Sequence, residues 1–494
     1  MSLYRRALLA GLSSSLLALP TGAQAPTPPP PTLLPTLPPR VALPAHVTTA
    51  HVLELPGRTL RFSATAGSIV LADSHGAAPA AISFIAYQLD GADRRRRPVT
   101  FALNGGPGSA STWLHIGLLG PWRLALDGAA AAPSAAPVLH DNAETWLDFT
   151  DLVFIDPVGT GYSRFLVPGE EVRKRLWSVG GDIDSIAEAI RRWLEQANRV
   201  SSPSFLVGES YGGFRGPRLA RTLAEAHGVG LAGLVLVSPV LDFGGRSSAM
   251  EPLYWAAGLP TLVAAARGAA DRAAVADAEA YAAGDYLVEL VRGDADAAVV
   301  ARRSARVAEL TGLDAALVRR HGGRIDGPIF RRAHAPGRLA SVYDLSVSMP
   351  DPMPTATFSF QPDAMIDALA TPLRAAILDL YSQRLNWRVD AAYELSNMAA
   401  NRAWDWGNSR TAPESMRHLR TALAADPALR VLVAHGLYDA VTPYFRSKFL
   451  LDTIAPEAGA DRVVLRAYPG GHMFYSRDAM RTAFRAEALL LFAR

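Results

Sequence analysis

The feature that most constrains the fold is a series of short, continuous apolar runs, most of them followed closely by glycine or proline. Runs without alternation of polar and apolar residues are typical of strands buried on both faces of a parallel sheet. The sequence therefore predicts a sheet whose central strands lie side by side in parallel. Along the chain these runs are Pro98–Leu103, Leu152–Asp156, Ser204–Val207, Leu234–Val237, Val431–Ala434 and Val463–Leu465.

Helical segments separate several of these runs. Ile183, Ile186, Ile190 and Trp193 recur at the spacing of one helix face. Because strands alternate with helices, we predict an α/β fold with a mostly parallel central sheet and right-handed crossovers. Short β-prone runs within residues 47–89 predict antiparallel edge strands on the N-terminal side of this sheet.

The alternation of strands and helices lapses between residues 244 and 426. Helical periodicity dominates there, in a stretch rich in Ala, Arg and Asp. We therefore predict a largely helical cap insertion at 244–426. It separates the first part of the core, 46–243, from the second part, 427–494.

Composition excludes several classes of function. The 494 residues include 49 Lys and Arg against 46 Asp and Glu, a net charge of +3, so no nucleic-acid partner is expected. The absence of cysteine excludes disulfides, thiolate nucleophiles and cysteine-ligated metals. No H-E-x-x-H or P-loop pattern is present, so we expect neither a metal nor another cofactor. Composition leaves the oligomeric state open.

The N-terminus resembles a secretory signal peptide. Arg5 and Arg6 precede a mainly apolar stretch up to Leu19, and a small-residue cleavage site ends at Ala25. An uncleaved anchor is the alternative interpretation. We expect residues 1–25 to direct export to a periplasmic or extracellular location, without stable membrane insertion after cleavage. The proline-rich residues 26–45 predict an extended tether.

The segment Gly208-Glu209-Ser210-Tyr211-Gly212 fits the pattern G-x-S-x-G directly after a buried run. Between a strand and a helix, this pattern forms a sharp turn that exposes the serine hydroxyl at the carboxyl end of a parallel sheet. The sequence therefore predicts an α/β-hydrolase fold with Ser210 as the nucleophile. The N–H of Tyr211, the residue after the nucleophile, is one expected donor to the oxyanion.

A serine hydroxyl needs a general base, and the base needs a group that orients it. In this fold an acidic residue and then a histidine follow the serine, each after a late strand. Asp439 follows the run at 431–434 and His472 follows the run at 463–465. We therefore predict His472 as the base and Asp439 as its orienting group. His435 is a rival base, but it precedes the aspartate, which reverses the expected order.

Several further motifs accompany this arrangement. The glycine loop after the first central run is where an α/β-hydrolase supplies its other oxyanion donor. The motifs are N-G-G-P-G-S at 104–109, D-P-V-G-T-G-Y-S at 156–163, G-E-S-Y-G-G at 208–213, the loop at Asp439, and G-H-M at 471–473. Together they resemble the serine carboxypeptidases, peptidase family S10, and particularly their bacterial branch.

This resemblance implies hydrolysis of C-terminal peptide bonds through an acyl-enzyme on Ser210, with peptides as substrates. It also implies that Gly106 and Tyr211 form the oxyanion hole, and that Asn104 and Glu209 bind the terminal carboxylate of the substrate. A glutamate can do this only when it carries or shares a proton, so cleavage should favour acidic pH. The alternative interpretation of Glu209 is a buried acid that satisfies backbone donors beside the turn.

Two departures from the eukaryotic members affect the expected carboxylate site. Ala102 stands where they usually have tryptophan, and Leu118 and Leu119 stand near where they place a second glutamate. These differences bear on exopeptidase action more than on serine chemistry. An esterase or acyltransferase on the same fold therefore stays open as a second function. A non-catalytic binding protein with a retained site is the third.

Overall fold

The computed structural model describes residues 43–72, 78–126, 132–134, 136–244, 251–355 and 362–493. The predicted signal sequence, 1–25, and the tether up to residue 42 lie outside the described residues. Residues 43–45 of the predicted tether have no regular secondary structure. No helix within the described ranges is both long enough and apolar enough to span a membrane.

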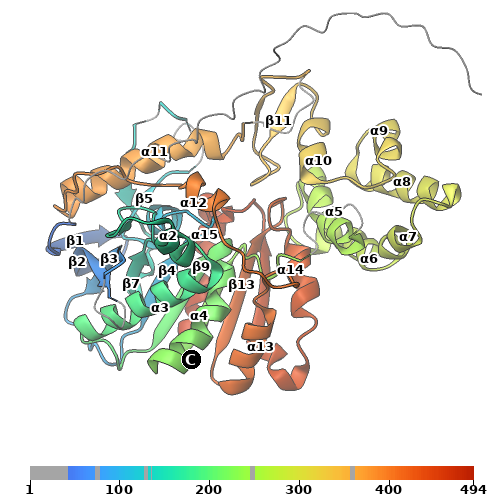
Figure 1. Ribbon diagram of the computed structural model, residues 1–494. Helices are drawn as coiled ribbons and strands as arrows, with labels where there is room; N and C mark the ends of the chain where they lie inside the picture. Colours follow the sequence, from blue (N-terminus) through green and yellow to red (C-terminus); the bar gives the residue numbers. More distant parts are fainter. Residues whose placement is uncertain are drawn as a thin grey trace, which may run out of the picture. The chain divides into compact units, whose positions relative to one another are not determined.

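The apolar runs form the centre of one sheet (Figure 1). The strand order is β1-β2-β3-β7-β4-β9-β10-β13-β14, with β8 paired to β3. Pairings from β7 through β14 are parallel, whereas β1, β2 and β3 pair antiparallel with one another and β3 pairs antiparallel with β7. The predicted α/β-hydrolase architecture is confirmed. The strands are β1 Val47–Leu55, β2 Arg58–Leu71, β3 Ala80–Leu89, β4 Val99–Leu103, β7 Asp151–Ile155, β8 Arg164–Phe165, β9 Ser204–Glu209, β10 Leu231–Val237, β13 Arg430–Gly436 and β14 Val463–Tyr468.

Strand β2 is longer than its sequence pattern indicates. It continues through Gly67, which pairs with Phe84 of β3 without a break in the pairing. A Cβ at Gly67 would lie 2.5 Å from the imidazole of His46, whose Nε2 hydrogen-bonds the carbonyl of Ser68 at 2.7 Å. A side chain at position 67 would therefore displace the His46 ring.

Helices cover both faces of the sheet (Figure 1). Helices α3 (Val179–Gln196), α4 (Tyr211–His227) and α13 (Met416–Ala425) pack on one face, and α15 (Asp478–Phe492) packs on the other. In α3 the apolar face identified from its spacing is buried against the sheet. The two apolar cores lie between these helices and the strands.

Much of the segment after β10 forms a separate helical layer with its own apolar core. Its first helix, α5, ends at Gly268 (φ 59°) and α8 ends at Gly312 (φ 67°), because glycine readily adopts the left-handed conformation that terminates a helix. The layer also packs on Tyr438, Tyr444 and Phe445 beside β13. Its helices are α5 Pro252–Arg267, α6 Ala276–Ala283, α7 Asp285–Arg292, α8 Ala297–Thr311, α9 Ala315–Arg320 and α10 Gly327–Ala333.

Two later helices of the segment 244–426 pack in other apolar cores. Helix α11 (Ile366–Asp379) joins the apolar core on one face of the sheet, and α13 joins the core on the other. The periodicity of the sequence does not distinguish these helices from those of the cap, because all of them bury one apolar face.

Shorter elements are α1 Thr112–Leu114, η1 His115–Leu119, β5 Trp122–Leu124, β6 Leu139–Asp141, η3 Trp146–Asp148, α2 Glu170–Leu176, η4 Ala273–Val275, β11 Arg338–Ala340, β12 Ser348–Pro350, η5 Leu380–Arg384, α12 Met398–Arg402, α14 Tyr444–Leu451, η6 Pro456–Ala458, η7 Ala460–Arg462 and η8 Phe474–Ser476.

Candidate active site

Ser210 occupies a strained turn between β9 and α4. Its φ is 60° and its ψ is −118°, a conformation that residues other than glycine rarely adopt. Backbone hydrogen bonds hold it there: the Ser210 N–H donates to Val237 O at 2.9 Å, and the Val240 N–H donates to Ser210 O at 3.1 Å. The turn has the geometry of a nucleophile elbow, as the G-x-S-x-G pattern predicts.

The glycines around Ser210 are required by backbone contacts. A Cβ at Gly208 would lie 2.1 Å from Gly212 O, and a Cβ at Gly212 would lie 2.2 Å from Leu103 O. A Cβ at Gly105 would lie 2.5 Å from Tyr211 N. No side chain fits at these positions. The loop after β4 therefore lies directly against the turn at Ser210.

This close approach brings together the two segments that carry the predicted oxyanion donors. Tyr211 is the first residue of α4, so its N–H has no acceptor within the helix, and the positive end of the helix dipole lies there. Gly106 lies in the loop against the turn, with a φ of +102°. Both segments thus flank Ser210 at the carboxyl ends of β4 and β9.

His472 and Asp439 form a buried hydrogen-bonded pair. His472 Nδ1 lies 2.7 Å from Asp439 Oδ2, and the two side chains are 3% and 0% exposed. Asp439 also accepts hydrogen bonds from the N–H groups of Val441 and Thr442, and from the Thr442 hydroxyl at 2.5 Å. Burial raises the pKa of Asp439, but His472 and these hydrogen bonds outweigh it and hold the pKa below its usual value. The carboxylate is therefore ionised and fixes the imidazole.

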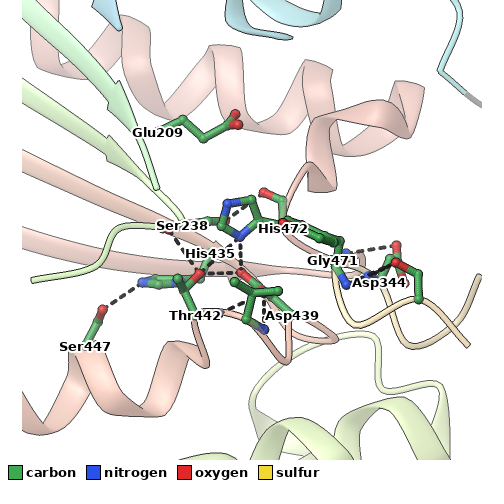
Figure 2. A network of polar contacts seen from close by, with 12 residues as sticks. Glu209, Ser238, Asp344, His435, Asp439, Thr442, Ser447, Gly471 and His472 are labelled. Atoms are coloured by element: carbon green, nitrogen blue, oxygen red, sulfur yellow. Dashed lines mark hydrogen bonds and ion pairs between the residues drawn. The ribbon is translucent and has the colours of Figure 1, made fainter. Parts of the chain in front are cut away.

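The segment after β10 connects this pair to the turn at Ser210. The Ser238 hydroxyl donates to His472 O at 2.8 Å, and Ser238 O accepts from the Thr442 hydroxyl at 3.0 Å (Figure 2). The preceding residue, Val237, accepts the Ser210 N–H. Hydrogen bonds from Val237 and Ser238 therefore connect the loops that carry all three predicted catalytic residues.

Tyr343 and Asp344 of the insertion hold the loop after β14 in place. Asp344 Oδ2 accepts from the Gly471 N–H at 2.9 Å and from Arg477 Nη2 at 2.9 Å. The His472 N–H donates to Tyr343 O at 2.6 Å, and the Tyr343 ring meets the imidazole edge-on. Sequence analysis missed this contribution, because no motif marks the segment and it lies far from both loops along the chain.

Glu209 is a buried carboxyl group that lies beside His472 (Figure 2). Its Oε1 accepts from Asn104 Nδ2 at 2.9 Å, and its Oε2 accepts from the Tyr475 hydroxyl at 2.5 Å. Burial raises its pKa to about 7, against the opposing effects of His472 and the two hydrogen bonds. These two partners are side chains, and Glu209 can carry a proton near neutral pH. Tyr475 was not identified from the sequence.

Asn104 is held rigidly by its own contacts. Its Oδ1 accepts the Leu114 N–H at 2.9 Å, and its carbonyl accepts from Arg215 Nη1 at 2.6 Å. Arg215 is fully buried and forms a bidentate ion pair with Asp182 of α3, at 2.7 and 3.0 Å. The amide of Asn104 is therefore oriented so that one N–H reaches Glu209.

His435, the rival base, lies behind the pair formed by Asp439 and His472. It is fully buried, and its Nε2 lies 2.9 Å from the Ser447 hydroxyl (Figure 2). Burial lowers its pKa to about 4, so the ring is neutral over the physiological range. Its hydrogen bond is with Ser447 of α14, and Asp439 orients His472 instead.

Within the described residues, no group of three or more His, Asp or Glu side chains is placed to hold a metal ion.

Comparison with known proteins gives a partial match. Residues 81–264 match the family model described as serine carboxypeptidase. Serine carboxypeptidase-like 8 of Arabidopsis thaliana is 26% identical over 215 residues, 40% of this chain and 46% of the relative. The pheromone-processing carboxypeptidase KEX1 of Yarrowia lipolytica is 30% identical over 148 residues, 30% of this chain and 22% of the relative. The matches to these relatives therefore span less than half of the relatives' length. The family-model match includes Ser210 but neither Asp439 nor His472.

The solved structures that align with this chain are distant. Homoserine O-acetyltransferase from Bacillus anthracis aligns with a TM-score of 0.37 and 11% identity, over 92% of this chain and 99% of that one. Proline iminopeptidase from Mycobacterium smegmatis aligns with a TM-score of 0.35 and 13% identity, over 90% and 99%. Scores this low say nothing about the chemistry of the site.

The raised pKa of Glu209 predicts a pH-dependent stability. Since the folded-state pKa of about 7 lies above the ordinary glutamate value of 4.5, the free energy of unfolding should fall as pH rises from about 4.5 to about 7. Glu209→Gln cannot ionise and should be more stable than the wild type at pH 8, by up to about 3 kcal/mol. At pH 4.5 the two proteins should be nearly equal. Urea unfolding at both pH values measures this, and a variant that is less stable than the wild type at pH 8 contradicts it.

Proposed function

We propose that this protein is a serine carboxypeptidase of peptidase family S10, which hydrolyses C-terminal peptide bonds through an acyl-enzyme on Ser210. The observation that carries the proposal is the combination of the strained turn at Ser210, the buried His472–Asp439 pair and the neighbouring Asn104–Glu209 pair. The family match over residues 81–264 supports it.

In the proposed mechanism, the Ser210 hydroxyl attacks the carbonyl carbon of the last peptide bond, and its proton passes to Nε2 of His472. The ionised Asp439 stabilises the resulting imidazolium. The N–H groups of Gly106 and Tyr211 bind the oxyanion of the tetrahedral intermediate. His472 then returns the proton to the leaving amine, which leaves an ester on Ser210. Water, deprotonated by His472, hydrolyses the ester and restores the serine.

The Asn104–Glu209 pair suits recognition of the free carboxylate at the end of a peptide. Protonated Glu209 can donate to a carboxylate oxygen, and Asn104 offers a second amide N–H. Ionised Glu209 would repel the same carboxylate. A simple ester has no such group, so the pair gives a reason to favour carboxypeptidase over esterase or acyltransferase activity.

The finer parts of the proposal rest on the sequence. We propose that the chain belongs to the bacterial branch of the family, which its motifs at 104–109, 156–163 and 208–213 resemble. We assign it to the periplasm or the extracellular space because residues 1–25 have the pattern of a signal peptide. Peptides are the proposed substrates, and no cofactor takes part in the proposed chemistry.

Cleavage of N-blocked dipeptides tests the proposed function. The wild type should release the free C-terminal amino acid, and amidation of the C-terminus should raise KM because the carboxylate is lost. Ser210→Ala and His472→Ala should each lower kcat by about 10⁴-fold or more. Release of amino acids is measured by mass spectrometry, beside hydrolysis of an aryl ester. Turnover of the ester without any turnover of the peptides would favour the esterase alternative.

The pH dependence of KM tests the role of Glu209. Since binding requires its proton, KM for a blocked dipeptide should be constant well below pH 7 and should rise as Glu209 ionises above it. Tyr475→Phe removes a hydrogen bond that favours the ionised form, so the rise should move to higher pH. Steady-state kinetics from pH 5 to 9 measure both curves. A flat KM in the wild type, or a rise at lower pH in the variant, contradicts this role.

A further inference from the structure

The loop at 156–163 carries one of the motifs found in the sequence, D-P-V-G-T-G-Y-S, but takes no part in the mechanism above. It follows β7, which pairs with β4, so it lies beside the glycine loop at the carboxyl edge of the sheet. Both loops contact the same late segment of the insertion, residues 393–404, which includes the short helix α12. We call this segment the strap.

Backbone and side-chain hydrogen bonds hold the strap against the loop after β7. The Gly161 N–H donates to Glu394 O at 2.8 Å, and the Glu394 N–H donates to Gly161 O at 3.0 Å. Asn397 Nδ2 donates to Gly159 O at 2.8 Å. A Cβ at Gly161 would lie 1.8 Å from Asp156 Oδ2, so no side chain fits there. The loop after β7 therefore anchors the strap to the sheet.

The strap then crosses the glycine loop that carries Gly106. The Asn397 N–H donates to Gly108 O at 2.7 Å. Asn401 Nδ2 donates to Pro107 O at 3.0 Å. A Cβ at Gly108 would lie 2.7 Å from Asn397 O, so the two backbones are in direct contact. The two residues that follow Gly106 are thus both fixed by the strap.

The end of the strap contacts the residue that carries the other proposed oxyanion donor. The ring of Trp404 meets the ring of Tyr211 edge-on, with the ring centroids 5.6 Å apart. Both side chains are buried in one small apolar cluster, together with Val179 and Phe214. One segment of the insertion therefore lies against both halves of the proposed oxyanion hole.

The glycine loop needs this support because its own backbone is free to move. Gly106 and Gly108 have φ values of 102° and 101°, in a region that is open to glycine but rarely to other residues. An N–H stabilises an oxyanion only when it lies about 2.7–3.1 Å away, and a displacement of about 1 Å can lower a rate about 10²-fold. Hydrogen bonds from the strap supply the constraint that the glycines lack.

The two asparagines of the strap differ in what else they do. Asn397 also caps α12, since its Oδ1 accepts the Ala400 N–H at 2.9 Å, so its replacement would disturb the strap itself. Asn401 lies in the last turn of α12, where its side chain bonds the glycine loop directly. A change at Asn401 therefore separates the effect on the glycine loop from the folding of the strap.

We propose that the strap positions the oxyanion hole, and that Asn401 is a positioning residue that holds the Gly106 N–H where the oxyanion forms. The inference rests on the proposed function in one respect, that Ser210 attacks a carbonyl carbon whose oxygen is bound by Gly106 and Tyr211. It gives the loop at 156–163 a role, as the anchor of the strap. It also makes a segment outside the family match at 81–264 complete a site that lies inside that match.

The kinetics of Asn401→Ala test the proposal. Since the oxyanion is absent from the bound substrate, kcat should fall at least about tenfold while KM stays within about twofold. A blocked dipeptide and an aryl ester are both measured, because the same oxyanion forms from each. Arg402→Ala is the matched control: it removes an exposed side chain from the same helix and should leave both constants within about twofold.

A blocked amino-acid aldehyde gives a second readout. The Ser210 oxygen bonds to its carbonyl carbon, the C=O double bond becomes a single bond, and the hydroxyl proton passes to His472. The former carbonyl oxygen then lies where the oxyanion would form. The Ki of the aldehyde should therefore rise at least about tenfold in Asn401→Ala, in step with the fall in kcat/KM. The corresponding alcohol cannot add to the serine and should bind the wild type and the variant equally.

A further variant guards against an effect on folding. Asn401→Asp keeps the shape of the side chain but replaces the donor to Pro107 O by an acceptor, so it should show the same loss of kcat. Thermal unfolding checks that each variant is folded.

An unchanged kcat in folded Asn401→Ala and Asn401→Asp, a change confined to KM, or an unchanged Ki of the aldehyde would overturn the role of Asn401. An equal loss of kcat in Arg402→Ala would overturn it too. A wild type that cleaves the ester but no peptide contradicts carboxypeptidase activity alone, since the ester still reports on the oxyanion hole. If the wild type cleaves neither, the proposed function fails and this role fails with it.

Discussion

The organisation of the site depends on the backbone of a single residue. Ser210 has a positive φ, and the turn that holds it is closed on every side by backbone atoms, so Gly105, Gly208 and Gly212 have no room for a Cβ. The conformational strain is compensated by the parallel sheet, since Val237 of β10 accepts the Ser210 N–H. Because β4, β9 and β10 end at the same edge, one turn brings together a hydroxyl, a glycine loop and the first N–H of α4.

The electrostatics of the site separate two carboxyl groups that lie near the same imidazole. Asp439 accepts hydrogen bonds from His472, the Thr442 hydroxyl and two backbone N–H groups and stays ionised, whereas the buried Glu209 accepts from the neutral donors Asn104 and Tyr475. The pKa values of the two groups therefore move in opposite directions. In the proposed mechanism this difference lets one carboxylate orient the base while the other carboxyl group carries a proton for the substrate.

Much of this arrangement could be predicted from the sequence, because the strand pattern and the order of Ser210, Asp439 and His472 follow from one sheet with a shared edge. The parts that escaped prediction are contacts between segments with no motif of their own. Asp344 of the insertion accepts a hydrogen bond from the Gly471 N–H, and Tyr475 of the short helix η8 donates its hydroxyl to Glu209. The division of residues 244–426 among separate apolar cores was equally hidden, since each helix buries one face whatever it packs against.

The most direct test of the account is covalent labelling with a fluorophosphonate, followed by mass spectrometry of the modified peptide. If Ser210 is the nucleophile activated by His472, the wild type carries one label, on the peptide that contains Ser210. Ser210→Ala should then remain unlabelled, and His472→Ala should react far more slowly. A wild type that stays unlabelled, or a label on a different serine, would contradict the central claim.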